Sequence, residues 1–142
     1  MSESGHREIT KELRQKAQEI FYTIPFVQLL GIKLDELEPG RATMSVTLRT
    51  DLMRHQGMMH GGVTASLIDS ATAFAVATNL NEGEHAVTVD LTIHYLRPVT
   101  EGTARCEAKV LRAGKKLLTV SAEVFNESDK LVATALTTYS KI

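Results

Sequence analysis

The sequence predicts an α+β fold in which a curved antiparallel sheet wraps around one central helix. Six segments have the composition of strands, and five of them alternate apolar and polar residues with the period of two that a half-buried strand requires. The segment 60–80 is instead apolar on nearly every side, as expected for a helix covered by protein. Because short connections join successive strands, we expect antiparallel pairing.

Composition places the chain among ordinary folded proteins. Its 142 residues are expected to form one domain, 1–142, and a content of 43% hydrophobic and 23% charged residues argues against intrinsic disorder. The net charge of -1 argues against a general nucleic-acid binder, and the single cysteine excludes an intramolecular disulfide and a cysteine-built zinc site. We find no secretory signal and no convincing membrane span, so we expect a cytoplasmic protein without membrane or nucleic-acid partners.

The first helix is expected near the N-terminus. Apolar residues recur at helical spacing over residues 7–23, within an N-terminal amphipathic segment 1–24. Pro25 marks the expected end of this helix, and the apolar residues 26–31 are interpreted as a short turn.

The strands fall into two groups on either side of the central helix. Glycine, asparagine or aspartate stands at the breaks between them and favours tight turns. The expected strands are a pair joined at Pro39-Gly40 within residues 32–48, followed by residues 86–97, 103–111, 116–126 and 130–140. A polar loop at residues 49–59 leads into the central helix.

Asp69 is the only ionisable side chain between Gly61 and Leu80. A carboxylate in an apolar helix is costly unless it is hydrogen-bonded or used in chemistry. One interpretation is therefore a general base. The other, equally compatible with its position, is a charge at a wet edge of the helix that Ser or Thr hydroxyls hold.

His60, Gly61 and Gly62 stand at the start of this helix. Paired glycines let a backbone approach another group closely, and the first amides of a helix have no partner within it. With the positive end of the helix dipole behind them, these amides suit a carbonyl oxygen that gains negative charge. The alternative is a glycine turn that merely admits a tightly packed helix.

The spacing of these two features predicts a dimer if both are catalytic. Gly61 and Asp69 are eight residues apart, which is about 12 Å along a helix. A base and an oxyanion donor must both lie about 3 Å from the reacting carbonyl group. One chain therefore cannot offer both to one substrate, whereas two antiparallel helices across a two-fold axis can form two equivalent sites.

The run His60-Gly-Gly-Val-Thr-Ala-Ser-Leu-Ile-Asp69 resembles the signature of hotdog-fold acyl-CoA thioesterases of the PaaI-like, phenylacetate-degradation type. The runs Ala86-Val-Thr-Val-Asp90-Leu and Tyr95-Leu-Arg-Pro98 resemble that family's third strand, and the hairpin Gly114-Lys115-Lys116 also fits. The resemblance implies a hotdog fold, hydrolysis of an acyl-CoA, and self-association as a homodimer, with pairing of dimers into a homotetramer.

The resemblance implies a role for each residue that matches the motif. Asp69 would act on the thioester carbonyl as general base or nucleophile, and Gly61 of the partner subunit would hold the oxyanion through its amide. His60 would shape the helix start and contact the thioester, Gly62 would contact the substrate, and Thr88 would help to position water. The resemblance implies no metal and no redox cofactor, since coenzyme A enters as part of the substrate.

Basic residues are the expected contacts of the coenzyme A phosphates. The resemblance points to Arg97, Lys115 and Lys116, for which a solvated surface charge is an equal alternative. At one position the sequence departs from the family, because many relatives carry Asn six residues before the histidine and this chain carries Arg54. Arg54 or Gln56 would then donate hydrogen bonds to the substrate in place of that Asn.

Two other functions stay open at this point. One is an acyl-CoA hydratase or dehydratase, because related hotdog proteins pair a His with an acidic residue. The other is a non-catalytic acyl-CoA-binding module, which the departure at Arg54 keeps open.

Two further groups of residues contain candidate functional side chains. Asp90 and His94 share one strand face, but four residues of strand span about 13 Å, too far for a dyad within one chain. Met53, Met58 and Met59 are candidates either for the lining of an acyl pocket or for gap-filling beside the core helix.

Overall fold

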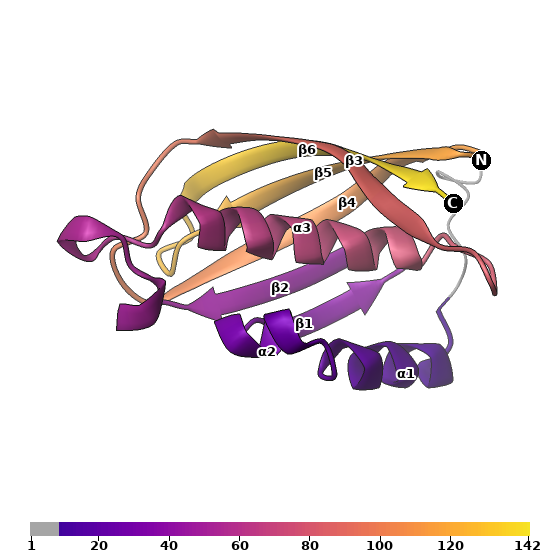
Figure 1. Cartoon of the computed structure of the whole chain (residues 1–142), viewed down its shortest axis with the longest axis horizontal. Coiled ribbons are helices and arrows are strands. Elements are labelled where there is room, and N and C mark those ends of the chain that lie inside the picture. The colour runs from indigo at the N-terminus through magenta and orange to yellow at the C-terminus, as the bar shows by residue number, and fades with distance from the viewer. Residues whose placement is uncertain (1–8) are drawn as a thin grey trace.

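In the computed structural model, which describes residues 9–142, a six-stranded antiparallel sheet curls around helix α3 (Figure 1). The strand order is β1-β2-β4-β5-β6-β3. The elements are α1 (Lys11–Phe21), α2 (Pro25–Leu30), β1 (Lys33–Glu38), β2 (Arg41–Thr47), two 3₁₀ turns (Thr50–Leu52 and His55–Gly57), α3 (Gly61–Ala77), β3 (Ala86–Tyr95), β4 (Thr103–Ala113), β5 (Leu117–Phe125) and β6 (Leu131–Lys141). The predicted curved sheet around a central helix is confirmed.

Helix α3 is central because its side chains are apolar on several sides. Leu67, Ile68 and Ala71 are 0% exposed, and a fully buried Leu or Ile stabilises the fold by ~2 kcal/mol. His60 is the N-cap residue rather than a helical one, and the helix ends at Ala77, three residues before the predicted end at residue 80. The Thr78 hydroxyl closes this end by donating to the Ala75 carbonyl at 2.7 Å.

The N-terminal segment differs from the prediction of one helix followed by a turn. Part of the predicted helical segment lies in residues 1–8, outside the described residues, and α1 begins at Lys11 after the N-cap Thr10. Pro25 does not only end a helix: it opens α2, since proline without its amide hydrogen fits the first turn of a helix. The expected turn at residues 26–31 is therefore mostly helical.

One expectation about pairing is incomplete. Short connections correctly indicate antiparallel neighbours for β1–β2, β4–β5 and β5–β6, but β3 pairs with β6 rather than with β4. Residues 96–102 carry the chain from β3 at one edge to β4 in the middle of the sheet. Strand alternation gives the buried face of each strand and does not encode which strand is its neighbour.

The two edges of the sheet differ in character. Strand β1 is six residues long, carries Lys, Asp and Glu side chains, and receives a hydrogen bond at the Leu37 carbonyl from Arg14 Nε of α1 at 3.0 Å. Strand β3 is ten residues long and forms the opposite edge, where Val87 and Val89 are 47% and 58% exposed. A long apolar edge strand is a template for pairing with another chain, whereas a short charged edge discourages it.

Candidate active site

Asp69 lies in the middle of α3, half-buried, and faces strands β3 and β6. Its Oδ1 atom accepts hydrogen bonds from the Thr88 hydroxyl of β3 at 2.9 Å and the Tyr139 hydroxyl of β6 at 3.2 Å. No residue within 9–142 hydrogen-bonds to Oδ2. One carboxylate oxygen is thus held in place by two hydroxyl groups while the other is available for chemistry.

Tyr139 belongs to this site, although the sequence analysis assigned it no role. Its side chain is 3% exposed, and its hydroxyl oxygen also lies 2.9 Å from Thr72 Oγ1 and 3.0 Å from the Asp69 carbonyl. Burial raises the pKa of Tyr139 to about 12, so the hydroxyl stays protonated and remains a donor near neutral pH. The available sequence signal was that a hydroxyl on a buried strand face needs a partner.

The start of α3 offers a free backbone amide. His60 Nδ1 accepts the Gly62 N–H at 2.8 Å, so the neutral ring carries its proton on Nε2. A Cβ at position 62 would lie 2.9 Å from His60 Nδ1, which explains why a glycine accompanies this cap. In the described part of the chain no atom accepts the Gly61 N–H. The Gly61 amide is therefore free and the Gly62 amide is not.

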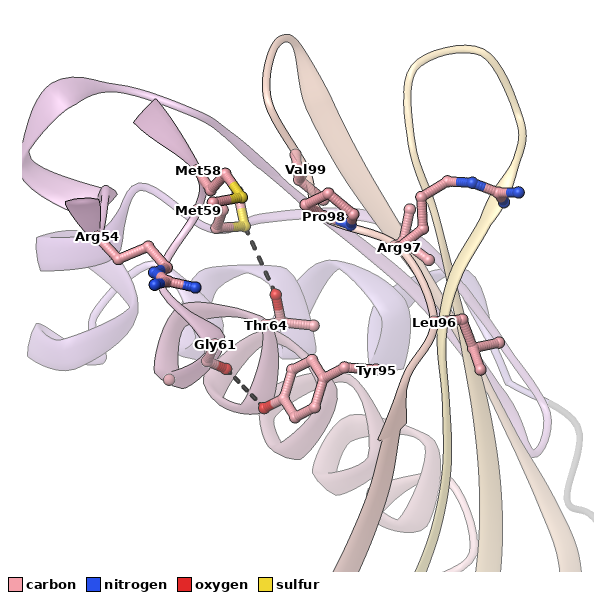
Figure 2. A pocket seen from close by; sticks show the side chains of 12 residues that line it. Arg54, Met58, Met59, Gly61, Thr64, Tyr95, Leu96, Arg97, Pro98 and Val99 are labelled. Atoms are coloured by element: carbon pink, nitrogen blue, oxygen red, sulfur yellow. Dashed lines mark hydrogen bonds between the residues drawn. The ribbon is translucent and has the colours of Figure 1, made fainter. Parts of the chain in front are cut away.

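Tyr95, at the end of β3, fixes the position of Gly61. Its hydroxyl donates to the Gly61 carbonyl at 2.8 Å (Figure 2). A Cβ added at Gly61 would lie 3.5 Å from the Tyr95 ring, which is an ordinary contact. Gly61 at the start of α3 therefore lies against Tyr95, the last residue of β3. Asp69 in the middle of α3 lies against Thr88, near the start of β3.

A cavity of about 560 Å³ opens beside the helix start (Figure 2). Its lining is mostly apolar and consists of Arg54, Met58, Met59, Gly61, Gly62, Thr64, Tyr95, Leu96, Arg97, Pro98, Val99 and Val132. Two of the three methionines singled out in the sequence are thus at the cavity, and Met53 instead forms an isolated β-bridge with Met59. The Thr64 hydroxyl donates to the Met59 sulfur at 3.6 Å.

The predicted basic residues do not all gather at this cavity. Arg54 and Arg97 line it, but Arg97 extends away from the helix start (Figure 2) and donates from Nη1 to the Leu131 carbonyl at 2.9 Å. Gln56 is exposed, has a positive φ of 68°, and is not among the lining residues.

Lys115 and Lys116 are exposed in the β4–β5 hairpin, at the other end of the sheet. The Lys116 carbonyl accepts from the Lys141 amide at 2.8 Å, and Lys141 pairs with Ala86 at the start of β3. Because the cavity lies at the end of β3, ten residues on, the hairpin is about 30 Å from it within one chain.

The two candidate catalytic groups therefore lie apart within one chain. Neither Asp69 nor Thr88 lines the cavity, and Gly61 and Asp69 are separated by eight residues of continuous helix, or about 12 Å.

Within residues 9–142 no group of three or more His, Cys, Asp or Glu side chains is placed to hold a metal ion. In the same residues no helix has the length and hydropathy to cross a membrane.

Comparison with known proteins points to one family. A model of the thioesterase superfamily matches residues 56–133. The medium/long-chain acyl-CoA thioesterase YigI of Salmonella typhimurium is 29% identical, over 83% of this chain and 86% of its own length.

Solved structures agree with this assignment. The PaaI protein from the phenylacetic acid degradation operon of Escherichia coli has a TM-score of 0.86 at 27% identity and covers 94% of this chain and 96% of its own. A mutant of the phenylacetic acid degradation protein PaaI of Thermus thermophilus has a TM-score of 0.77 at 33% identity and covers 83% and 99%. The expected hotdog fold is thereby confirmed.

Proposed function

The chain belongs to the thioesterase superfamily and is a thioester hydrolase, and from this premise we propose that it hydrolyses acyl-CoA at a site shared by two subunits. One observation carries the proposal: two hydroxyls hold one carboxylate oxygen of Asp69, and within residues 9–142 neither its other oxygen nor the Gly61 amide on the same helix has a hydrogen-bond partner. The family assignment favours hydrolysis over the hydratase and the binding module that the sequence left open.

Asp69 Oδ2 performs the first step of the proposed reaction. It accepts a proton from water while the water oxygen adds to the thioester carbonyl carbon. The carbon–sulfur bond then breaks, the proton passes to the departing thiolate, and a carboxylic acid and coenzyme A leave. In the alternative route Oδ2 itself adds to the carbonyl carbon, and the carbon–sulfur bond breaks as coenzyme A leaves as its thiolate. Water then hydrolyses the resulting anhydride, which releases the carboxylic acid, restores Asp69 and supplies the proton for the thiolate.

Thr88 and Tyr139 are positioning residues in either route. Their hydroxyls donate to Oδ1, which orients the carboxylate so that Oδ2 faces the substrate. Thr88 is exposed, so its hydroxyl also has access to the attacking water. The chemistry needs no metal and no redox cofactor.

Gly61 of the partner subunit provides the oxyanion contact. Its N–H donates to the carbonyl oxygen as that oxygen gains negative charge, a contact that typically lowers the barrier by ~3–4 kcal/mol. The positive end of the α3 dipole adds to the same stabilisation. His60 Nε2–H and the Arg54 guanidinium, both exposed near this helix start, are the further donors for the thioester.

The free edge of β3 is the surface on which the second subunit docks. Antiparallel pairing of two β3 strands sets the two α3 helices antiparallel and brings each helix start toward the Asp69 of its neighbour. The exposed apolar side chains of β3 are covered by this contact. Pairing of such dimers into a tetramer stays a prediction from the family resemblance.

Dimerisation also gives the separated lysines a role. Antiparallel pairing places the start of the partner's β3 beside the end of this chain's β3. The partner subunit's Lys115 and Lys116 then lie at the same end of the sheet as Arg54 and Arg97. Together these cations suit the phosphates of coenzyme A, while the apolar cavity lining suits a hydrocarbon acyl group.

The test is a panel of acyl-CoA substrates, aliphatic and aromatic and of increasing chain length, assayed for release of free thiol. Asp69→Ala should lower kcat/KM by three orders of magnitude or more, because no other described carboxylate occupies this place. Asp35→Ala, which removes an exposed carboxylate on β1, is the matched control and should keep wild-type turnover.

Circular dichroism and the melting temperature show whether Asp69→Ala remains folded. Near-normal thiol release from a folded Asp69→Ala protein removes the proposed mechanism. Saturable acyl-CoA binding without thiol release by the wild-type chain supports the non-catalytic alternative instead.

A further inference from the structure

The cavity beside the start of α3 carries positive charge and no negative charge. Its charged lining residues, Arg54 and Arg97, are both cations, and none of the lining residues is an Asp or a Glu. The Gly61 amide and the positive end of the α3 dipole have the same sign. A mostly apolar cavity with charge of one sign favours a ligand that carries the opposite charge.

The two arginines differ in what they contact. Arg97 extends away from the helix start and donates to the Leu131 carbonyl at 2.9 Å. Arg54 points into the cavity (Figure 2), and within residues 9–142 its guanidinium makes no hydrogen bond and no ion pair. Asp51, the acid nearest to Arg54 in the sequence, is not paired with it either. Arg54 is therefore a cation in the cavity that a ligand can neutralise.

The backbone that carries Arg54 is held by hydrogen bonds. The Arg54 N–H donates to the Met58 carbonyl at 2.7 Å, and Met53 and Met59 on either side form an isolated β-bridge. The Met59 N–H donates to the Val99 carbonyl at 2.8 Å, which ties the loop to another part of the cavity wall. A side chain that starts from a fixed backbone loses less freedom when it binds a ligand.

A neutral hydrocarbon chain leaves the charge of Arg54 without a partner. Filling the cavity with such a chain takes water away from the guanidinium and supplies no acceptor, which is costly. A carboxylate instead accepts parallel N–H bonds from the planar guanidinium. The remaining N–H groups of the same guanidinium can still donate to the thioester oxygen, provided that the carboxylate lies only a few bonds from it.

We propose that Arg54 selects acyl-CoA substrates whose acyl group ends in a carboxylate, namely short dicarboxylic acyl groups of the succinyl and glutaryl type. This inference rests on the proposed function and names the substrate class of the same site. The reaction is unchanged: water adds to the thioester carbonyl carbon, the carbon–sulfur bond breaks, and the products are coenzyme A and a dicarboxylate. Arg54 binds the acyl carboxylate and takes up no proton.

The phosphates of coenzyme A are the other source of negative charge for this guanidinium, because they suit the same donors. A contact between Arg54 and a phosphate strengthens the binding of every acyl-CoA alike, and that of free coenzyme A as well. A contact with the acyl carboxylate strengthens the binding of dicarboxylic acyl groups only. Substrates that differ in the acyl group alone therefore distinguish the two sources.

The test compares thiol release from two pairs of substrates with equal carbon number: succinyl-CoA with butyryl-CoA, and glutaryl-CoA with valeryl-CoA. Spontaneous hydrolysis of each substrate is measured in buffer without protein and subtracted. The wild type should favour the dicarboxylic member of each pair in kcat/KM by about tenfold or more, because hydrogen bonds to charged groups are strong. Inhibition by free coenzyme A is measured alongside.

Three variants of exposed arginines show whether this preference comes from Arg54. Arg54→Gln keeps hydrogen-bond donors and removes the charge, so it should abolish most of the preference while leaving inhibition by free coenzyme A unchanged. Arg54→Glu repels a carboxylate and should favour the neutral member of each pair. Arg41→Gln, on β2 and outside the cavity, is the matched control and should keep the wild-type preference.

Two results overturn the inference while thiol release stands. One is a wild type that favours the neutral member of both pairs. The other is an Arg54→Gln protein that loses equally on both members; weaker inhibition by free coenzyme A would then place the guanidinium on a phosphate.

If the wild type releases no thiol from any substrate, the proposed function fails and calorimetric binding of the same pairs decides the inference. Tighter binding of the dicarboxylic members that Arg54→Gln removes supports the assignment of Arg54, and equal binding of both members overturns it.

Discussion

The middle and the start of α3 differ in how their candidate functional groups are held. At its middle, Asp69 is packed between two strands, and hydroxyls from β3 and β6 fix one of its oxygens. At its start, Gly61 lines an open cavity, and the Tyr95 hydroxyl donates to its carbonyl. Asp69 does not line this cavity, and none of the residues that line it is an Asp or a Glu.

This difference explains why the proposed enzyme needs two copies. A continuous helix of 17 residues cannot bring its start onto its own middle, so in the proposed reaction Asp69 and the Gly61 amide meet only across an interface between subunits. Substitutions at one of the two groups at a time therefore test the proposed shared site.

Gly61→Pro removes the proposed oxyanion donor at the start of α3, and we expect it to lower activity strongly. Proline at the first helical position removes the N–H and keeps the helix, and His60 already has the extended backbone, with ψ at 134°, that a following proline requires. If this amide holds the oxyanion, kcat falls by about 10²–10³-fold. Steady-state thiol release measures the change.

Gly61→Ala is the matched control for that variant. It adds a Cβ that makes only an ordinary contact with Tyr95 and retains the amide hydrogen. Its kcat should stay within a few-fold of wild type. Equal losses in the alanine and proline variants would show that bulk at position 61, and not the missing donor, is responsible.

Tyr139→Phe weakens the hydrogen bonding that holds Asp69 in place. It removes one of two donors to Asp69 Oδ1, and we expect kcat to fall about tenfold with a loss of ~1–2 kcal/mol in the free energy of unfolding. Tyr22→Phe, on an exposed tyrosine whose hydroxyl makes one 3.4 Å bond, should change neither quantity measurably. A Tyr139→Phe protein with wild-type kcat contradicts the positioning role.

The same tyrosine predicts a pH dependence. Its pKa is raised from 10.0 to about 12 in the folded protein, so the stability linked to it is fully present below pH 10 and is lost as the pH rises toward 12. Urea unfolding between pH 9 and 12 should show a shallower decline for Tyr139→Phe than for wild type. Parallel curves for the two proteins exclude the linkage.

Substitutions of His60 should have the smallest effects. They separate its role as helix cap from a contact with the thioester. His60→Ala removes the cap on the Gly62 amide and should cost ~1 kcal/mol of stability, whereas His60→Asn restores a good N-cap. If the imidazole also contacts the thioester, both variants lose activity by several-fold while only the alanine variant loses stability. Full activity in His60→Asn would limit His60 to capping.

The sequence was sufficient where the signal is local. Asp69 stands out as one charge in an apolar helix, and His60, Gly61 and Gly62 adjoin that helix, so the eight-residue spacing on which the predicted dimer rests is readable without coordinates. The buried faces of the strands follow from alternation, which is also a local property.

What the sequence did not reveal depends on long-range packing. Tyr139 reaches Asp69 across 70 residues of chain, and nothing local distinguishes it from another inward residue of β6. The pairing of β3 with β6 also sets the distance between Lys116 and Arg97, which the resemblance assigned to the phosphates of one ligand. The bulge at Val89 is visible only once two strands are laid side by side.

The central claim is that each site takes Asp69 from one subunit and the start of α3 from the other, and mixed dimers test it most directly. Asp69→Ala and Gly61→Pro subunits, each inactive alone, are refolded together in equal amounts. Half of the dimers are then mixed, and each mixed dimer holds one intact site and one doubly defective site. The account predicts recovery of about a quarter of wild-type thiol release; activity no higher than the mean of the two inactive proteins, in a mixture shown to contain mixed dimers, would contradict it.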